Sequence, residues 1–180
     1  MSTIEPGISV DPVNHSYEEA LAAIGTGDLQ HNVVLEKIAY HAQQSEWESL
    51  WCLADALKRE VSVLFDSQGL IWVDVGTRGQ VRLSPPVGCR LPLKLWIHTH
   101  PWDAYWSHTD RNTLSSASRV LEEAIVLGHD HYVLSQNHYH GRSRRRGAGR
   151  HHLSAFGPLS NWTDEHRVMY ASLNDPMEGL

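Results

Sequence analysis

Apolar residues recur at helical spacing over the first third of the chain, which predicts three helices there. The first begins at a capping box, in which Ser16 stands three residues before Glu19, and it ends at Gly25. The second covers about residues 33–41, and the third covers about residues 46–59, where apolar side chains form one stripe. We therefore expect helices to dominate this part of the chain.

The spacing of apolar residues then changes to two, which is typical of strands. Residues 61–65 and 70–75 are rich in β-branched and aromatic side chains, and a short turn containing Gly69 joins them, so they predict a β-hairpin. Further strands are expected at residues 80–83 and 93–97, on either side of a proline-rich loop.

The second half of the chain predicts one more helix and one more strand. Apolar residues at helical spacing predict a helix over residues 114–127, and residues 131–134 predict a last strand. Residues 141–150 lack periodicity and predict a loop, while residues 161–173 are weakly amphipathic. No internal repeat or linker interrupts the pattern, so the sequence predicts a single domain of the α/β class.

The composition is that of a globular domain with an unusual histidine content. The 180 residues include 15 basic and 21 acidic side chains, for a formal net charge of −6, and 41% of the residues are apolar. This length suffices for one core but not for a TIM barrel, which needs roughly 250 residues. Two cysteines, Cys52 and Cys89, exclude a disulfide framework and a cysteine-rich zinc site. The 13 histidines and 7 tryptophans are the unusual counts.

The sequence gives no indication of a membrane protein. No apolar run approaches the ~20 residues that span a bilayer, and the N-terminus lacks the charged-then-apolar pattern of a secretory signal. We therefore expect a cytoplasmic protein. The negative net charge also disfavours nucleic acid as a partner.

One segment places metal-binding residue types at meaningful spacing. His98 and His100 follow an expected strand, and because alternate strand residues point the same way, their imidazoles share one face. Pro101 ends the strand, and Ser107 is a natural N-cap for a helix whose first turn contains Asp110. A helix that packs back on the strand end would bring Asp110 onto the two imidazoles. Two histidines and one carboxylate are a usual ligand set for catalytic zinc, so the segment predicts one Zn²⁺ ion.

These residues resemble the signature of the JAMM (MPN-type) zinc metalloproteases. That signature is an upstream Glu, then His-[Ser/Thr]-His-Pro, a loop, and Ser-x-x-Asp at the start of a helix; here it reads His98-Thr99-His100-Pro101 and Ser107-His108-Thr109-Asp110. The loop between the two parts is about one residue shorter than in most members, a change that loops absorb readily.

The resemblance covers roughly residues 46–140 and implies a fold and its boundaries. The implied fold is the cytidine-deaminase-like JAB/MPN fold, a mixed β-sheet flanked by helices. The implied regions are an N-terminal helical extension at 1–45, a catalytic domain at 46–150, and a C-terminal extension at 151–180 packed on the same domain.

The family's upstream Glu lies near the start of an early strand that follows a helix. Glu60 fits that position, because it ends the third expected helix and precedes the hairpin. Glu46 and Glu48 are alternatives farther upstream. The structural alternative for Glu60 is an exposed carboxylate beside its basic neighbours, Lys58 and Arg59.

The resemblance implies hydrolysis of an amide or isopeptide bond, often at the C-terminus of a ubiquitin-like modifier. Zinc would be held by His98, His100 and Asp110, Glu60 would act as general base, and the Ser107 hydroxyl would donate to the oxyanion. The expected partner is then a peptide or a ubiquitin-like protein. Two alternatives stay open: a non-catalytic MPN-type scaffold, and a nucleic-acid-associated protein similar to the RadC type, which the arginine-rich stretch at 142–150 supports weakly.

Aromatic and histidine residues around the motif have less specific readings. Trp102, Tyr105 and Trp106 form either a rim that contacts substrate or a hydrophobic lid over the site. His129 and His131, near the last strand, have Asp130 as their one acidic neighbour, so we expect surface or half-buried histidines there and not a second metal site. Four tryptophans are expected in the core or on a sheet face: Trp47, Trp51, Trp72 and Trp96.

Overall fold

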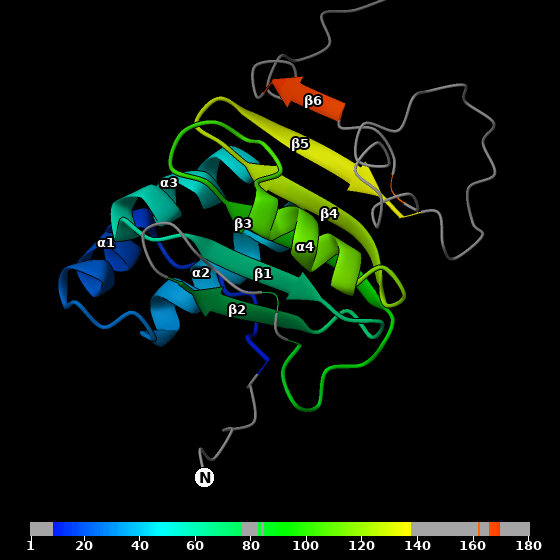
Figure 1. Cartoon of the computed structure of the whole chain (residues 1–180). Coiled ribbons are helices and arrows are strands. Elements are labelled where there is room, and N and C mark those ends of the chain that lie inside the picture. The colour runs from blue at the N-terminus through cyan, green and yellow to red at the C-terminus, as the bar shows by residue number, and fades with distance from the viewer. Residues whose placement is uncertain (1–8, 77–82, 84, 138–161, 163–165, 170–180) are drawn as a thin grey trace, which may run out of the picture.

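A mixed β-sheet between helices forms the body of the protein (Figure 1). The computed structural model describes residues 9–76, 83, 85–137, 162 and 166–169. Its elements in chain order are α1 (Tyr17–Gly25), α2 (Asn32–Gln44), α3 (Trp47–Leu57), β1 (Val61–Phe65), β2 (Ile71–Val75), β3 (Leu93–Thr99), α4 (His108–Ser116), β4 (Leu121–Leu127), β5 (His131–Gln136) and β6 (His166–Met169). The strand order is β2-β1-β3-β4-β5-β6, in which β3 and β4 pair in parallel and the other neighbours are antiparallel. The predicted α/β class is confirmed.

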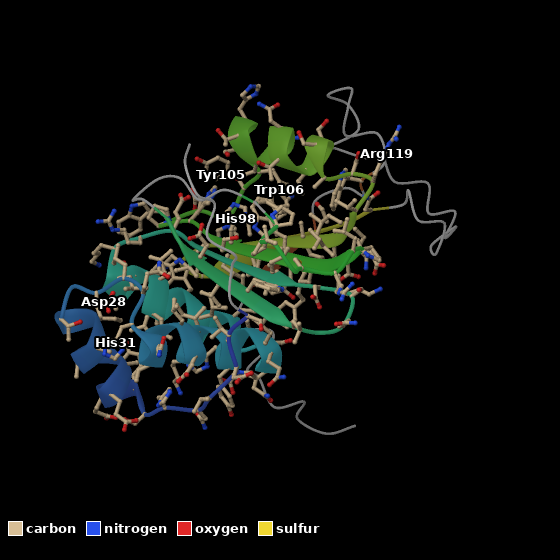
Figure 2. All side chains as sticks on the ribbon, turned by 90° about the horizontal axis from the view of Figure 1, so that it is seen from below. Asp28, His31, His98, Tyr105, Trp106 and Arg119 are labelled. Carbon is tan, nitrogen blue, oxygen red and sulfur yellow. The ribbon has the colours of Figure 1, made fainter. Side chains whose placement is uncertain are left out.

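The helices cover the two faces of the sheet separately. Figure 2 shows α4 on one side of the sheet and the N-terminal helices on the other. The core is divided accordingly: one cluster joins α1, α2 and α3 to Val61, Ile97 and Ile125, and a second cluster, which contains Trp96 and Val126, lies on the α4 side. Because strand side chains alternate between faces, each central strand contributes to both clusters.

The three N-terminal helices are present as predicted, although α2 extends to Gln44, beyond the predicted end at residue 41. The Ser16–Glu19 capping box is formed in both directions, and α2 and α3 are followed by Ser45 and Lys58, whose backbones are left-handed. Ala20 of α1 and Ile38 of α2 are fully buried in the cluster that also contains the sheet residues. Residues 17–44 therefore share the core of the sheet. None of the described helices is long and apolar enough to cross a bilayer.

The predicted hairpin is confirmed as β1 and β2, and a buried carboxylate holds its turn. The backbone N–H groups of Gln68, Leu70 and Arg90 donate to the Asp66 side chain at 2.9–3.1 Å. Asp66 therefore joins the turn to the loop that precedes β3. The strand expected at 80–83 lies outside the described residues except for Leu83, which is not in a strand.

The helix predicted over residues 114–127 is wrong after Ser116. α4 ends at Ser116, and Leu121–Leu127 is the strand β4 in the middle of the sheet. Ala124, Ile125, Val126 and Leu127 are all buried, because helices or loops cover both faces of this strand. Such a strand has a continuous apolar run, which spacing alone does not distinguish from a buried helix.

The strand expected at residues 131–134 is present as β5, but it is not the last strand. β6 pairs with β5 and lies inside the weakly amphipathic stretch at 161–173. The arginine-rich stretch at 142–150 lies outside the described residues.

Candidate metal centre

The end of β3 and the start of α4 bring the three predicted metal ligands together. His98 lies in β3, between Ser62 of β1 and Val126 of β4, and His100 follows directly after the strand. The backbone N–H of His100 donates to Leu127 O at 2.8 Å, and the Trp51 indole donates to His100 O at 2.8 Å. The backbone of this ligand is thus fixed by β4 on one side and by α3 on the other.

The three side chains converge at distances that suit one small ion. His98 Nε2 and His100 Nε2 lie 3.2 Å apart, and the Asp110 oxygens lie 3.1 Å from His98 Nε2 and 3.3 Å from His100 Nε2. Ligand atoms at 2.0–2.1 Å from a tetrahedral zinc lie about 3.3 Å from one another, as the edges of the tetrahedron. In the part of the chain that the structure describes, this is the one group of three or more such side chains that converges in this way.

A helix cap orients the carboxylate. The backbone N–H of Ser107 donates to Asp110 Oδ2 at 2.8 Å, and the backbone N–H of Asp110 donates to Ser107 Oγ at 3.2 Å. This capping box is the local reason that α4 begins at His108. Since Ser107 Oγ accepts this bond, its hydroxyl hydrogen remains available to a ligand at the site.

The surroundings of His98 and Asp110 favour the protonation states that bind a metal. Burial lowers the pKa of His98 and keeps its imidazole neutral, which is the form that binds a metal. Burial alone would raise the pKa of Asp110, but hydrogen bonds from the His100 and His98 rings and from Ser107 outweigh it and lower the pKa. The site therefore presents a neutral His98 imidazole and an ionised Asp110 carboxylate.

Tryptophan rings enclose the His98 side. The Trp96 ring stacks on the His98 ring with centroids 4.5 Å apart, and the Trp106 ring lies 5.6 Å from it. The Trp106 indole donates to Ser135 Oγ of β5 at 3.0 Å. His98 Nδ1 is buried and has no hydrogen-bond partner among the described residues. The side chains around the His98 ring are therefore aromatic. The position of the His98 ring is set by these contacts and not by a hydrogen bond at Nδ1.

Glu60 lies in a cavity that also reaches His100. The cavity has a volume of about 390 Å³, and its walls include Trp51, Arg59, Glu60, Thr99, His100 and Pro101. The N–H of Gly76 donates to Glu60 O at 2.8 Å, and the N–H of Val61 donates to Thr99 Oγ1 at 2.9 Å, so the start of β1 is tied to the end of β3. Glu60 is 8% exposed, so the alternative of an exposed carboxylate is wrong.

The other two candidate carboxylates lie elsewhere. Glu46 precedes α3, and its side chain lies 2.6 Å from His41 Nδ1. Glu46 and Glu48 line a different cavity, whose walls come from the start of α3 and from Leu95, Ile125 and Leu134. The wall of this second cavity contains none of the three candidate metal ligands.

Sequence reasoning missed the residues that hold the loop between the ligands, which is residues 101–106. The N–H of Ala104 donates to His131 Nε2 at 3.1 Å, and the N–H of His129 donates to Trp102 O at 2.6 Å. At Gly128 an added Cβ would lie 2.5 Å from Ala104 N and 2.6 Å from Trp102 O, so the backbones approach as closely as glycine allows. The spacing of residues along β5 indicates which side chains face α4, but no sequence pattern shows that one of them holds a loop.

The three aromatic residues of this loop have different environments. Trp106 is buried, whereas Trp102 is 73% exposed and Tyr105 is 54% exposed. The Tyr105 ring meets the His100 ring edge-on, with centroids 4.9 Å apart. Figure 2 shows Trp106 and His98 between α4 and the sheet, with Tyr105 beside them. The four tryptophans expected inside the fold, at positions 47, 51, 72 and 96, are all buried.

The histidines near β5 do not form a second metal group among the described residues. His131 is buried and pairs with Asp130 through Nδ1 at 2.6 Å. The His129 ring lies edge-on to the Trp51 ring, with centroids 5.1 Å apart. Both residues contact the loop, through His131 Nε2 and the backbone N–H of His129.

Comparisons of this chain with protein-family models, with curated proteins and with solved structures find no match.

Proposed function

We propose that this protein is a zinc-dependent peptidase or isopeptidase that hydrolyses an amide bond with the help of Glu60. The observation that supports this most is the convergence of His98, His100 and Asp110 at 3.1–3.3 Å, beside a cavity lined by Glu60 and His100. Two imidazoles and one carboxylate leave a fourth position for water or substrate, which is the arrangement of catalytic zinc sites.

The donor set favours zinc over the other common divalent ions. Calcium and magnesium prefer six or more oxygen ligands, whereas this group offers two nitrogens and one carboxylate. A zinc ion held there would supply an electrophile for the scissile carbonyl and a water whose pKa falls toward neutrality.

The residues of the chain then have distinct tasks. Glu60 accepts the proton of the attacking water and returns it to the leaving amine. The Ser107 hydroxyl donates to the oxygen of the scissile carbonyl as negative charge develops on it. Asp110 stays ionised and His98 stays neutral, because their environment lowers the pKa of both groups.

The same features support membership of the JAMM family with its JAB/MPN fold. Glu60 before β1, His98 and His100 at the end of β3, and Ser107 and Asp110 at the start of α4 occur in the order of that signature. We therefore propose a peptide or the C-terminal tail of a ubiquitin-like protein as the substrate. The short loop between His100 and Ser107 does not prevent the three ligands from converging.

The test is zinc content together with chelator-sensitive cleavage of ubiquitin-like fusion proteins and peptides. Purified protein is expected to bind one zinc ion, to cleave at least one of these substrates, and to lose activity when a chelator removes the metal. Glu60→Gln should keep the zinc and abolish cleavage, because the amide cannot accept the proton. Glu48→Gln is the matched control and should behave as the unmodified protein.

The outcomes separate the candidate functions. Absence of zinc uptake at micromolar concentration would overturn the proposal. Zinc binding with full activity in the Glu60→Gln variant would remove Glu60 from the role of base. Zinc binding with no cleavage of any substrate in the panel would favour the non-catalytic scaffold.

A further inference from the structure

Two large aromatic side chains beside the metal centre are exposed and are carried by a fixed loop. Trp102 and Tyr105 are among the most exposed large hydrophobic residues of the described chain. Burial of the large apolar surface of a tryptophan stabilises a fold, and an exposed tryptophan does not give this stabilisation. An exposed tryptophan therefore often marks a binding surface. The three contacts of the loop with Gly128, His129 and His131 keep both residues in place. We therefore interpret them as a rim of the site and not as a lid that closes over it.

A line of rings connects this rim to the cavity that contains Glu60. Trp51 forms part of the cavity wall, and the His129 ring lies 5.1 Å from the Trp51 ring. The Trp102 ring lies 6.4 Å from the His129 ring, at the outer end of the line. A chain that leaves the cavity in this direction passes over His129 and reaches the exposed ring of Trp102.

Acidic residues are the sequence neighbours of Trp102 and His129. Asp103 follows Trp102 directly and is exposed, and the side chain of Asp130, which follows His129, is 57% exposed and pairs with His131 Nδ1. The outer end of the line therefore combines an accessible indole with the exposed carboxylate of the next residue, Asp103. An indole ring attracts a cation over its face, and nearby carboxylates add to that attraction.

We propose that Trp102, together with Asp103, is a specificity site for a lysine or arginine side chain of the substrate, a few residues from the scissile amide. This inference rests on the proposed function, because it assigns the substrate class of the same centre. The cation would lie over the Trp102 ring while the scissile bond lies at the metal ligands. A substrate with an acidic or neutral side chain at the position that meets Trp102 would lack the attraction between a cation and the indole ring.

Binding measurements on the Glu60→Gln protein test the proposal without any need for turnover. The probes are fluorescent peptides of glycine, serine and alanine in which one residue is lysine, norleucine or glutamate, and this residue is moved through successive positions. We expect lysine at one position to bind about 2- to 30-fold more tightly than norleucine, the range of a cation–π contact. Glutamate at that position should bind more weakly than norleucine.

Variants of the rim assign the preference to Trp102. Trp102→Ala should make lysine and norleucine peptides bind equally, Trp102→Phe should keep part of the preference, and Asp103→Asn should reduce it most at low salt. Tyr17→Ala removes another exposed aromatic side chain, on α1, and should change nothing. Equal binding of lysine and norleucine peptides at every position, or an unchanged preference in Trp102→Ala, would overturn the proposal.

The peptide-binding measurements also separate the test of this inference from the test of the proposed function. A lysine preference that depends on Trp102, in a protein whose parent shows no hydrolysis, would leave the binding site valid and refute the enzyme. Hydrolysis without any such preference would refute the specificity site alone.

Discussion

His131 Nε2 accepts the backbone N–H of Ala104 at 3.1 Å, which joins β5 to the loop between two candidate metal ligands. Asp130 lies 2.6 Å from the other ring nitrogen, so His131 Nδ1 carries the hydrogen and Nε2 is the acceptor. His100 precedes this loop and Asp110 follows it. The loop therefore transmits the position of β5 to the metal centre.

Loss of the Ala104 hydrogen bond should weaken metal binding. In His131→Leu the buried N–H of Ala104 has no acceptor, so the loop shifts, and we expect zinc affinity to fall about 10- to 100-fold, as for other supporting residues of metal sites. His131→Gln provides an acceptor oxygen and should retain most of the affinity. Competition with a zinc-binding dye measures the zinc affinity of both variants. Equal zinc affinities of His131→Leu and His131→Gln would contradict the role of the hydrogen bond.

Removal of the charge of Asp110 should remove the metal without unfolding the helix. Asp110→Asn keeps an oxygen that accepts the Ser107 N–H but lacks the negative ligand, so zinc content after gel filtration should fall well below one ion per chain. His108→Ala, two residues earlier on the exposed side of α4, is the control and should bind zinc normally. A normal zinc content in Asp110→Asn would exclude the carboxylate as a ligand.

Ser107 has both a structural and a proposed catalytic task, and two variants distinguish them. Ser107→Ala loses the helix cap, worth about 1 kcal/mol, and the proposed oxyanion donor, worth about 10²–10³ in kcat. Ser107→Thr keeps the hydroxyl and should retain both. Thermal unfolding and cleavage rates measure the two effects; a loss of stability with an unchanged kcat in Ser107→Ala would limit the residue to capping.

The close approach at Gly128 predicts a strong effect of a single methyl group. In Gly128→Ala the new Cβ would lie 2.5 Å from Ala104 N, so backbone must move, at a cost of about 1–3 kcal/mol. For a chain of this size that corresponds to a decrease in Tm of roughly 3–10 °C. Gly25→Ala, where nothing lies within 4 Å, should leave Tm unchanged or raise it.

The ionised Asp66 side chain should make part of the free energy of unfolding sensitive to acid. Burial raises the pKa of Asp66, but the N–H groups of Arg90, Gln68 and Leu70 outweigh this and lower the pKa below its ordinary value. A lowered folded-state pKa means that this contribution is complete above the unfolded pKa of about 3.9 and is lost as the pH falls toward the folded-state pKa. Asp66→Asn should therefore be less stable than the unmodified protein at neutral pH, with a difference that shrinks below about pH 4. Urea unfolding at several pH values measures it, and a difference independent of pH would contradict the assignment.

Local patterns predicted those parts of the fold that carry a cap, a turn or a strand-ending signal. The capping box at Ser16, the turn with Gly69 between β1 and β2, and Pro101 after the strand that leads into His98 are such signals. β4 is an apolar run covered on both faces, and the spacing of its residues predicts a helix instead of a strand. The error concealed the parallel pairing of β3 and β4, which determines where α4 crosses the sheet.

The candidate metal centre could be predicted because its ligands lie close together in the sequence. Strand alternation places His98 and His100 on one face, and the helix cap fixes Asp110 relative to Ser107. The residues that hold the loop come from Gly128 and β5, far along the chain, and such contacts depend on tertiary packing that no spacing encodes.

The capping box of α4 would also determine how fast an ion held at the candidate metal centre can leave. Asp110 Oδ2 faces His100 and also accepts the Ser107 N–H, so fraying of the first helical turn would withdraw the carboxylate from the metal. Helix ends open far more often than the central strands of a sheet, so His98 in β3 and His100 directly after it would stay in place while Asp110 moves away and returns. Metal exchange and amide hydrogen exchange at Asp110 should therefore share one opening rate. The lifetime of the loaded site is then a property of four residues at the start of a helix and is separate from the stability of the whole domain.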